Sequence, residues 1–270
     1  MKKDIFLKQF PASLEYEVSK LYNTFEIAME YNIITYTEEF YTPNIWKKLT
    51  EKIEGIKVIT EGVFKNSDRR QIGFVPEEIF RKEVLNMNGK IKNNMEFPCR
   101  LLKIEINSKF SEYTHRDFLG SLIGLNIKRE LMGDLILYGD KGYIPVSEKI
   151  ADYILSELNR IGNVPCIVEK MNMKDAENIP EYRYDDRLIV VSSKRLDSII
   201  SAITNISRTK VIEPIEKGKV FIDYYEEKNK ARILEIGSLI TIRGVGKYKL
   251  FSEHGETKKG KERLLIKKYI

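Results

Sequence analysis

Residues that hold metals or redox groups are scarce in this sequence. Its 270 residues include two cysteines, Cys99 and Cys166, and two histidines. The cysteines form no C-x-x-C pair, which argues against a disulfide framework or a cysteine-based zinc site and fits a reducing cytoplasm. Two histidines are too few for a histidine-rich metal site. We therefore expect a protein that uses no metal and no cofactor.

Long apolar runs are missing as well. No stretch approaches the roughly 18 apolar residues that a membrane-spanning helix needs. Asp4 and Lys8 interrupt the N-terminal segment in which a signal peptide would have its apolar core. These features predict a cytoplasmic protein without a membrane partner.

Excess positive charge is confined to the last third of the chain. Residues 181–270 contain 20 lysines and arginines against 13 acidic residues, whereas residues 1–180 contain 26 against 27. The hydrophobic content of 42% is ample for packed cores. A local basic surface of this kind points to a polyanion as the partner.

The spacing of apolar residues predicts an α+β protein in three parts. Residues 1–83 are expected to form an N-terminal α/β domain. An amphipathic helix follows Leu14 to Ala28, a second helix starts at Pro43, and two strands flank the polar turn KNSD. This part shows no catalytic constellation.

Residues 84–180 are predicted to fold as strand, helix, two strands, helix and strand. The hairpin turns at GDKG, and Ser147 is expected to cap the second helix. This β-α-β-β-α-β order is that of ferredoxin-like domains, which RNA-recognition (RRM) domains share. Because the aromatic RNP1 motif is not evident, we do not expect bases to stack on this sheet.

Residues 181–270 are predicted to begin with two short helices. Ser192 or Ser193 can cap the first helix, and Ser207 can cap the second, which ends at Gly218. Two strands follow, and the tail GKYKLFSEHGETKKGKERLLIKKYI is typical of a long basic hairpin.

A resemblance to a known family rests on four strings. RLDSIISAITNISRTKVIEPIEKGKVFI, with the later IGSLITIRG, resembles the S4 RNA-binding module of two short helices and a small curved sheet. When the strings HRDFLGSLIGLNIKRELMGDLIL and GKYKL…GETKKGK are considered together with these two, residues 97–270 resemble the YlmH family of bacterial S4-domain proteins. Pro214 departs from the family pattern and is expected to kink or loosen the second S4 helix.

The resemblance implies a non-enzymatic RNA-binding protein. Family members are associated with large ribosomal subunits that carry peptidyl-tRNA, in ribosome-associated quality control of stalled chains. The implied partners are therefore rRNA and tRNA on the large ribosomal subunit. DNA is not expected, and the oligomeric state is left open.

The first group of candidate RNA contacts lies around the two short helices. Ser207, Arg208 and Lys210 cluster at a helix N-terminus, where backbone N–H groups and the helix dipole favour a phosphate. Arg195 starts the preceding helix and is expected on the same surface. Asp197 is expected either to orient Arg195 or to support the start of the helix.

The other candidates extend this surface or lie apart from it in the sequence. Lys217 and Lys219 flank Gly218, and Arg243, Lys247 and Lys249 are expected to continue the basic face. The last candidates are Lys258, Lys259 and Lys261 at the hairpin tip, with His115 and Arg116 at the start of the middle helix.

Two strings are similar to catalytic motifs. HRD at residues 115–117 is similar to a kinase catalytic loop, but Leu122 stands where that loop needs Asn, and Thr114 with Asp117 forms a helix capping box. His115 and Arg116 therefore either start a helix or project from it toward RNA. GETKKGKE has Glu262 where a P-loop needs Ser or Thr, which favours a basic hairpin tip.

Two other functions stay open. S4 modules often accompany pseudouridine synthase or methyltransferase domains, so the chain could be an RNA-modification enzyme or accessory factor, although no catalytic domain is recognisable. A cell-division-linked interaction protein is the other alternative, because genes of the family lie near cell-division genes.

Overall fold

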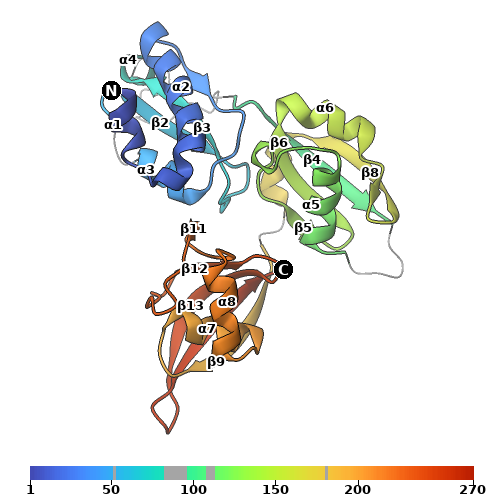
Figure 1. Cartoon of the computed structure of the whole chain (residues 1–270). Coiled ribbons are helices and arrows are strands. Elements are labelled where there is room, and N and C mark those ends of the chain that lie inside the picture. Colours follow the sequence, from blue (N-terminus) through green and yellow to red (C-terminus); the bar gives the residue numbers. More distant parts are fainter. Residues whose placement is uncertain (51–52, 82–95, 108–112, 180–181) are drawn as a thin grey trace. The chain divides into compact units, whose positions relative to one another are not determined.

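Figure 1 shows the computed structural model of the chain, which describes residues 1–50, 53–81, 96–107, 113–179 and 182–270. The chain is an α+β protein with separate sheets, as expected, and it divides into two compact units, Met1–Glu181 and Tyr182–Ile270. The predicted boundaries at 83/84 and 180/181 lie outside the described residues. The division into three parts stays a prediction.

The first unit opens with helices packed on a small antiparallel sheet. The helices are α1 (Lys3–Leu7), η1 (Ala12–Leu14), α2 (Glu15–Tyr31), α3 (Pro43–Thr50) and α4 (Glu77–Ile79). The strands lie in the order β1 (Thr35–Tyr36), β3 (Gln71–Pro76) and β2 (Ile56–Glu61). Phe25 of α2 meets Phe74 of β3 edge-on, with ring centroids 5.8 Å apart, so the apolar stripe of the predicted helix forms the core.

A second antiparallel sheet in this unit has the expected β-α-β-β-α-β order, with one unexpected two-residue strand added after the second helix. Its strands lie in the order β5 (Ile136–Tyr138), β6 (Lys141–Ser147), β4 (Cys99–Ile106), β8 (Val164–Met171) and β7 (Arg160–Ile161). The helical segments are α5 (His115–Gly124), η3 (Arg129–Leu131), α6 (Glu148–Glu157) and η4 (Met173–Asn178). Phe118 of α5 and Ile154 of α6 enter the same core, so both helices cover one face of this sheet.

The predicted N-cap position of α6 is confirmed, but the capping hydrogen bond is absent. Ser147 precedes the helix as expected, but its Oγ donates a hydrogen bond to Oε2 of Glu38 at 2.7 Å instead of accepting one from the first turn. Glu38 also pairs with Lys149 at 3.3 Å. The Glu38 carboxylate therefore holds the Ser147 hydroxyl away from the first turn of α6. The same carboxylate links the segment after β1 to the start of α6 within the first unit.

The second unit is a six-stranded antiparallel sheet with two helices on one face. The strands lie in the order β11 (Tyr225–Glu226), β10 (Val220–Ile222), β12 (Leu239–Ile242), β13 (Gly246–Glu256), β14 (Glu262–Tyr269) and β9 (Tyr184–Val191). Ile199 of α7 (Leu196–Thr204) and Val211 of α8 (Arg208–Glu216) pack on Leu250 and its neighbours in one core. Strand β9 was not expected, whereas the tail forms the predicted hairpin.

The cap predicted for α7 is wrong, whereas Ser207 is the N-cap residue of α8, as predicted, but makes no capping hydrogen bond. Arg195, not Ser192 or Ser193, is the N-cap residue of α7, and the first two helical N–H groups donate to the carbonyls of Arg232 and Lys230, at 2.8 and 3.1 Å. The Oγ of Ser207 lies 3.1 Å from the hydroxyl of Thr209 rather than on a backbone N–H of α8. Backbone carbonyls thus accept from the N–H groups of α7 that the predicted cap was expected to join. Helix α8 continues past Pro214 to Glu216.

Candidate nucleic-acid interface

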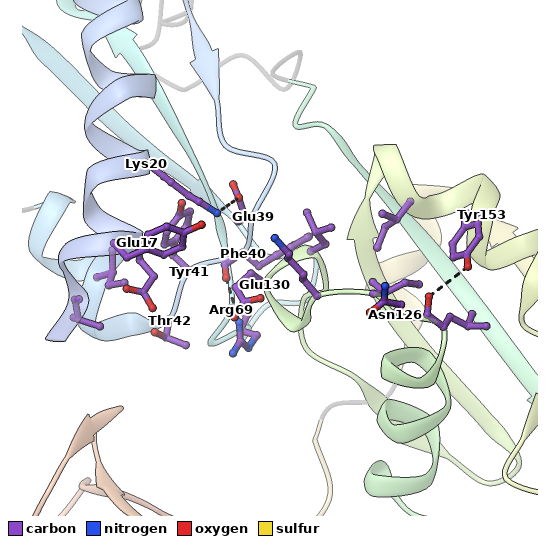
Figure 2. A pocket seen from close by; sticks show the side chains of 18 residues that line it. Glu17, Lys20, Glu39, Phe40, Tyr41, Thr42, Arg69, Asn126, Glu130 and Tyr153 are labelled. Atoms are coloured by element: carbon purple, nitrogen blue, oxygen red, sulfur yellow. Dashed lines mark hydrogen bonds and ion pairs between the residues drawn. The ribbon is translucent and has the colours of Figure 1, made fainter. Parts of the chain in front are cut away.

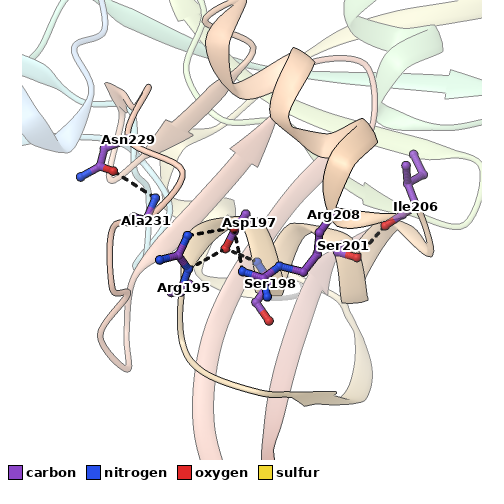
Figure 3. A network of polar contacts seen from close by, with 8 residues as sticks. All are labelled: Arg195, Asp197, Ser198, Ser201, Ile206, Arg208, Asn229 and Ala231. Carbon is purple, nitrogen blue, oxygen red and sulfur yellow. Dashed lines mark hydrogen bonds and ion pairs between the residues drawn. The ribbon is translucent and has the colours of Figure 1, made fainter.

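An acidic side chain joins two arginines where α7 and α8 begin (Figure 3). Arg195 donates from Nε and Nη2 to the two carboxylate oxygens of Asp197, at 3.2 and 3.1 Å. Arg208, the first residue of α8, donates from Nη2 to Oδ2 of Asp197 at 2.8 Å. The backbone N–H of Ser198 completes the set at 2.8 Å. We call Arg195, Asp197 and Arg208 the arginine cluster.

Burial differs sharply within the arginine cluster. The Asp197 side chain is 8% exposed, whereas those of Arg195 and Arg208 are 36% and 47% exposed. Burial opposes ionisation of Asp197, but the hydrogen bonds from both arginines outweigh it and hold the pKa of this carboxyl below its usual value. The cluster therefore carries two guanidinium charges against one buried carboxylate, and its positive groups face solvent.

The geometry of the arginine cluster suits a phosphate. A guanidinium has five N–H donors in a fixed fork. The hydrogen bond from Arg208 to Asp197 uses the donor Nη2. Fixing the guanidiniums in advance lowers the entropy lost when an anion binds. Arg195 and Arg208 thus lie on one surface, as expected, and Asp197 orients both of them.

The lysines next to the helices are exposed. Lys210 lies in the first turn of α8, and Lys219 lies just before β10. Lys217 pairs with Glu213 one turn earlier, at 2.6 Å, and its side chain is 61% exposed. Contacts of this exposed kind contribute little to folding, so these charges remain available to a polyanion.

Lys247 and Lys249 do not continue the surface of the arginine cluster. In β13, Tyr248 and Leu250 point into the core beneath the helices, so the alternating residues Lys247 and Lys249 lie on the other face of the sheet. Arg243 follows β12, and its guanidinium lies 4.5 Å from the ring centroid of Phe221. The structure therefore separates the predicted basic face into two surfaces.

The hairpin tip presents its three lysines to solvent. Lys258, Lys259 and Lys261 are exposed in the turn between β13 and β14, which projects beyond the rest of the sheet (Figure 1). The turn is held locally, because the N–H of Lys261 donates to Oγ1 of Thr257 at 3.1 Å. The lysine side chains have no part in the core of the unit.

His115 and Arg116 belong to the first unit, at the start of α5. The predicted capping box is confirmed: Asp117 accepts from the N–H and hydroxyl of Thr114, at 2.8 and 2.7 Å. Nε2 of His115 lies 2.7 Å from the carbonyl oxygen of Leu135, whereas Arg116 is exposed. His115 is thus engaged with the fold, and Arg116 is the member of the pair that faces outward.

The first unit also contains a cavity of about 860 Å³ between α2 and the segment after α5 (Figure 2). Its charged lining residues are Glu17, Glu39, Glu130, Lys20, Arg69 and Lys128. Lys20 pairs with Glu39 at 3.2 Å. Because acids and bases are balanced here, the cavity lacks the positive field that RNA phosphates require.

Several residues near the basic surfaces were missed by sequence reasoning. Tyr184 in β9, Phe251 in β13, and Lys267 and Tyr269 in β14 lie on the same face of the sheet as Lys247. The alternation of charged and apolar residues in the tail was the available signal. Without the β9–β14 pairing, it did not show which residues share a face.

Comparisons with known proteins bear on both units. Residues 93–175 match a family model described as "Putative RNA-binding domain in YlmH". The chain is 27% identical over 207 residues to "Ribosome-associated protein quality control protein P2" of Bacillus subtilis (strain 168), covering 77% of this chain and 76% of that protein. The resemblance to the YlmH family is confirmed.

A solved structure also resembles the chain. It is described as cell division protein ylmH from Streptococcus pneumoniae; the match covers 63% of this chain and 97% of that one, with 21% identity and a TM-score of 0.49. The YlmH domain match at residues 93–175 contains the sheet from β4 to β8 together with His115 and Arg116, and it ends before the second unit.

Within the described part of the chain, no helix has the length and apolarity to cross a membrane.

Proposed function

We propose that this chain is a non-enzymatic RNA-binding protein that acts on the large ribosomal subunit. The RNA-binding family match and the ribosome-associated relative support a role in binding RNA at the ribosome. The family resemblance extends this proposal to rRNA and tRNA as ligands, to quality control of stalled chains, and to the cytoplasm as the location.

The second unit is proposed to be the S4-type module of this protein. Its two short helices, α7 and α8, are followed by β10, β12 and the basic hairpin, in the order that the S4 resemblance implies. The excess of lysine and arginine over acidic residues also lies in this unit. Both features favour the second unit as the main contributor of RNA affinity.

The arginine cluster is the observation that carries the proposal. One carboxylate, 8% exposed, fixes two guanidiniums at the junction of two helices and leaves both of them partly exposed. Such a pair recognises phosphate oxygens without bond chemistry, because guanidinium forks donate two parallel hydrogen bonds to one anion. The protein would therefore hold an RNA conformation by adding phosphate contacts.

Co-sedimentation of the full chain with purified large subunits tests this proposal. We expect the protein to pellet with subunits that carry peptidyl-tRNA and to return to the supernatant after ribonuclease digestion. Pelleting that resists digestion of the exposed RNA would instead favour a protein-interaction factor. A new modified nucleoside in the RNA after incubation, detected by mass spectrometry, would favour an RNA-modification enzyme.

A further inference from the structure

The sheet of the second unit has a face that α7 and α8 do not cover. Strand register places Tyr184 opposite Tyr269, and Leu188 opposite Leu265, on this face, which we call the open face. Leu188 is 57% exposed and Phe251 is 43% exposed. An antiparallel sheet that faces only water usually carries polar side chains on its outer face, so exposed apolar and aromatic side chains indicate a ligand surface.

Lysines lie directly over the aromatic rings of the open face. Nζ of Lys267 is 4.2 Å from the ring centroid of Phe251 and 5.3 Å from that of Tyr184. Nζ of Lys247 is 4.7 Å from the ring centroid of Tyr269. Each distance lies within the range of cation–π attraction, so rings and positive charges alternate across three adjacent strands.

The charge of the open face is positive along these strands. Lys249 lies opposite Lys267 in the β13–β14 register, and the carboxylate that β9 adds, Asp186, lies 3.7 Å from Nζ of Lys267. Lys267 is still the partner of two rings as well as of this acid. A second copy of the same face would bring these lysines against each other, whereas a polyanion with flat apolar groups matches both its charge and its rings.

We propose that the open face binds unpaired nucleotides of RNA, with bases stacking on Phe251 and Tyr184 and phosphates paired with Lys249 and Lys267. The inference rests on the proposed function for the class of ligand, and it adds a surface on the opposite side of the sheet from the arginine cluster. A base that reaches a ring displaces the lysine head, which then meets the adjacent phosphate. Stacking platforms combined with a positive track are the means by which proteins hold single strands.

Two RNAs that differ in one feature test the open face in the full-length protein. One is a blunt hairpin, and the other is the same hairpin with a single-stranded oligouridine extension. We expect the extension to raise the affinity of the wild-type protein for the hairpin. Phe251→Ala should lower the affinity for the extended hairpin on the order of tenfold and leave the affinity for the blunt hairpin unchanged. Tyr31→Ala, which truncates a 64% exposed ring in the first unit, is the matched control.

A second variant guards against a folding defect. If Phe251→Ala lowers the midpoint of thermal unfolding, Lys267→Gln makes the same comparison by removing the charge and leaving an uncharged polar side chain, and it should also lose affinity for the extended hairpin more than for the blunt one. An extension that adds no affinity, or equal losses on both RNAs, overturns the inference. The inference is also overturned if analytical ultracentrifugation shows that the wild type is a dimer and that Phe251→Ala is a monomer, because the face would then bind a second copy.

The same measurements separate this inference from the proposed function. Wild-type protein that binds the blunt hairpin without gain from the extension contradicts only the open-face site. Wild-type protein that binds neither RNA at low salt contradicts the proposed function itself.

Discussion

Nη2 of Arg208 lies 2.8 Å from Oδ2 of Asp197, so the first residue of α8 is tied to the second residue of α7. The same oxygen lies 3.1 Å from Nη2 of Arg195. One carboxylate thus fixes the relative position of two helices and of the two guanidiniums that they carry. If the proposed RNA site lies here, a change at Asp197 should alter both the stability of the second unit and its RNA binding.

The first prediction concerns Asp197→Asn. The amide keeps one acceptor but loses the charge, so we expect a loss of about 2 kcal/mol in the free energy of unfolding at neutral pH. Because the folded-state pKa of Asp197 is lowered, its stabilisation is present above the unfolded-state pKa and is lost as pH falls through the folded-state value.

Urea unfolding of the wild type and of Asp197→Asn measures this effect. The difference between the two proteins should be largest at neutral pH and should shrink below the ordinary Asp pKa of about 3.9. A difference that does not depend on pH would show that the carboxylate charge has no part in joining the helices.

The second prediction concerns the second unit alone. Its helices and strands share one core, so a fragment of residues 182–270 should fold and unfold cooperatively, as followed by circular dichroism. It should also keep measurable RNA binding, because it contains the arginine cluster and the basic hairpin. Equal affinity of residues 1–181 for the same RNA, at matched salt, would move the main site to the first unit.

The third prediction concerns the hairpin tip. Replacing Lys258, Lys259 and Lys261 together by Ala should weaken binding to large subunits and lower its salt dependence by up to about one counterion per lysine that contacts a phosphate. The midpoint of thermal unfolding should stay unchanged, since the side chains lie outside the core. A lower midpoint with unchanged binding would make the lysines structural.

Local patterns carried much of the prediction of the fold from sequence. The Thr114–Asp117 capping box, the helix after Pro43 and the tail hairpin depend on residues close together in the chain, and all three are present. The β-α-β-β-α-β order likewise follows from alternating strand and helix patterns. Each of these features is set by short-range spacing.

Long-range pairing could not be inferred in the same way. Strand β9 pairs with β14 at the far end of the unit, and its run of apolar residues from Leu188 to Val191 hides the alternation between faces. Without that register, Tyr184 and Leu188 could not be assigned to the same face of the sheet as Lys267. The link from Asp197 to Arg208 was missed for a related reason, because it joins two helices rather than neighbours on one.

The most direct test of the central claim compares two arginines in binding to large ribosomal subunits across a salt series. Arg187 is the matched control, because its side chain is 46% exposed and pairs with Asp185 at 2.6 Å, close to the 47% exposure and 2.8 Å of Arg208 with Asp197. We predict that Arg208→Ala weakens binding and lowers the salt slope by about one phosphate, that Arg208→Glu does more, and that Arg187→Ala changes neither. Equal effects of the Ala variants at both positions, or an unchanged salt slope for both Arg208 variants, would contradict the assignment of the arginine cluster as the phosphate site.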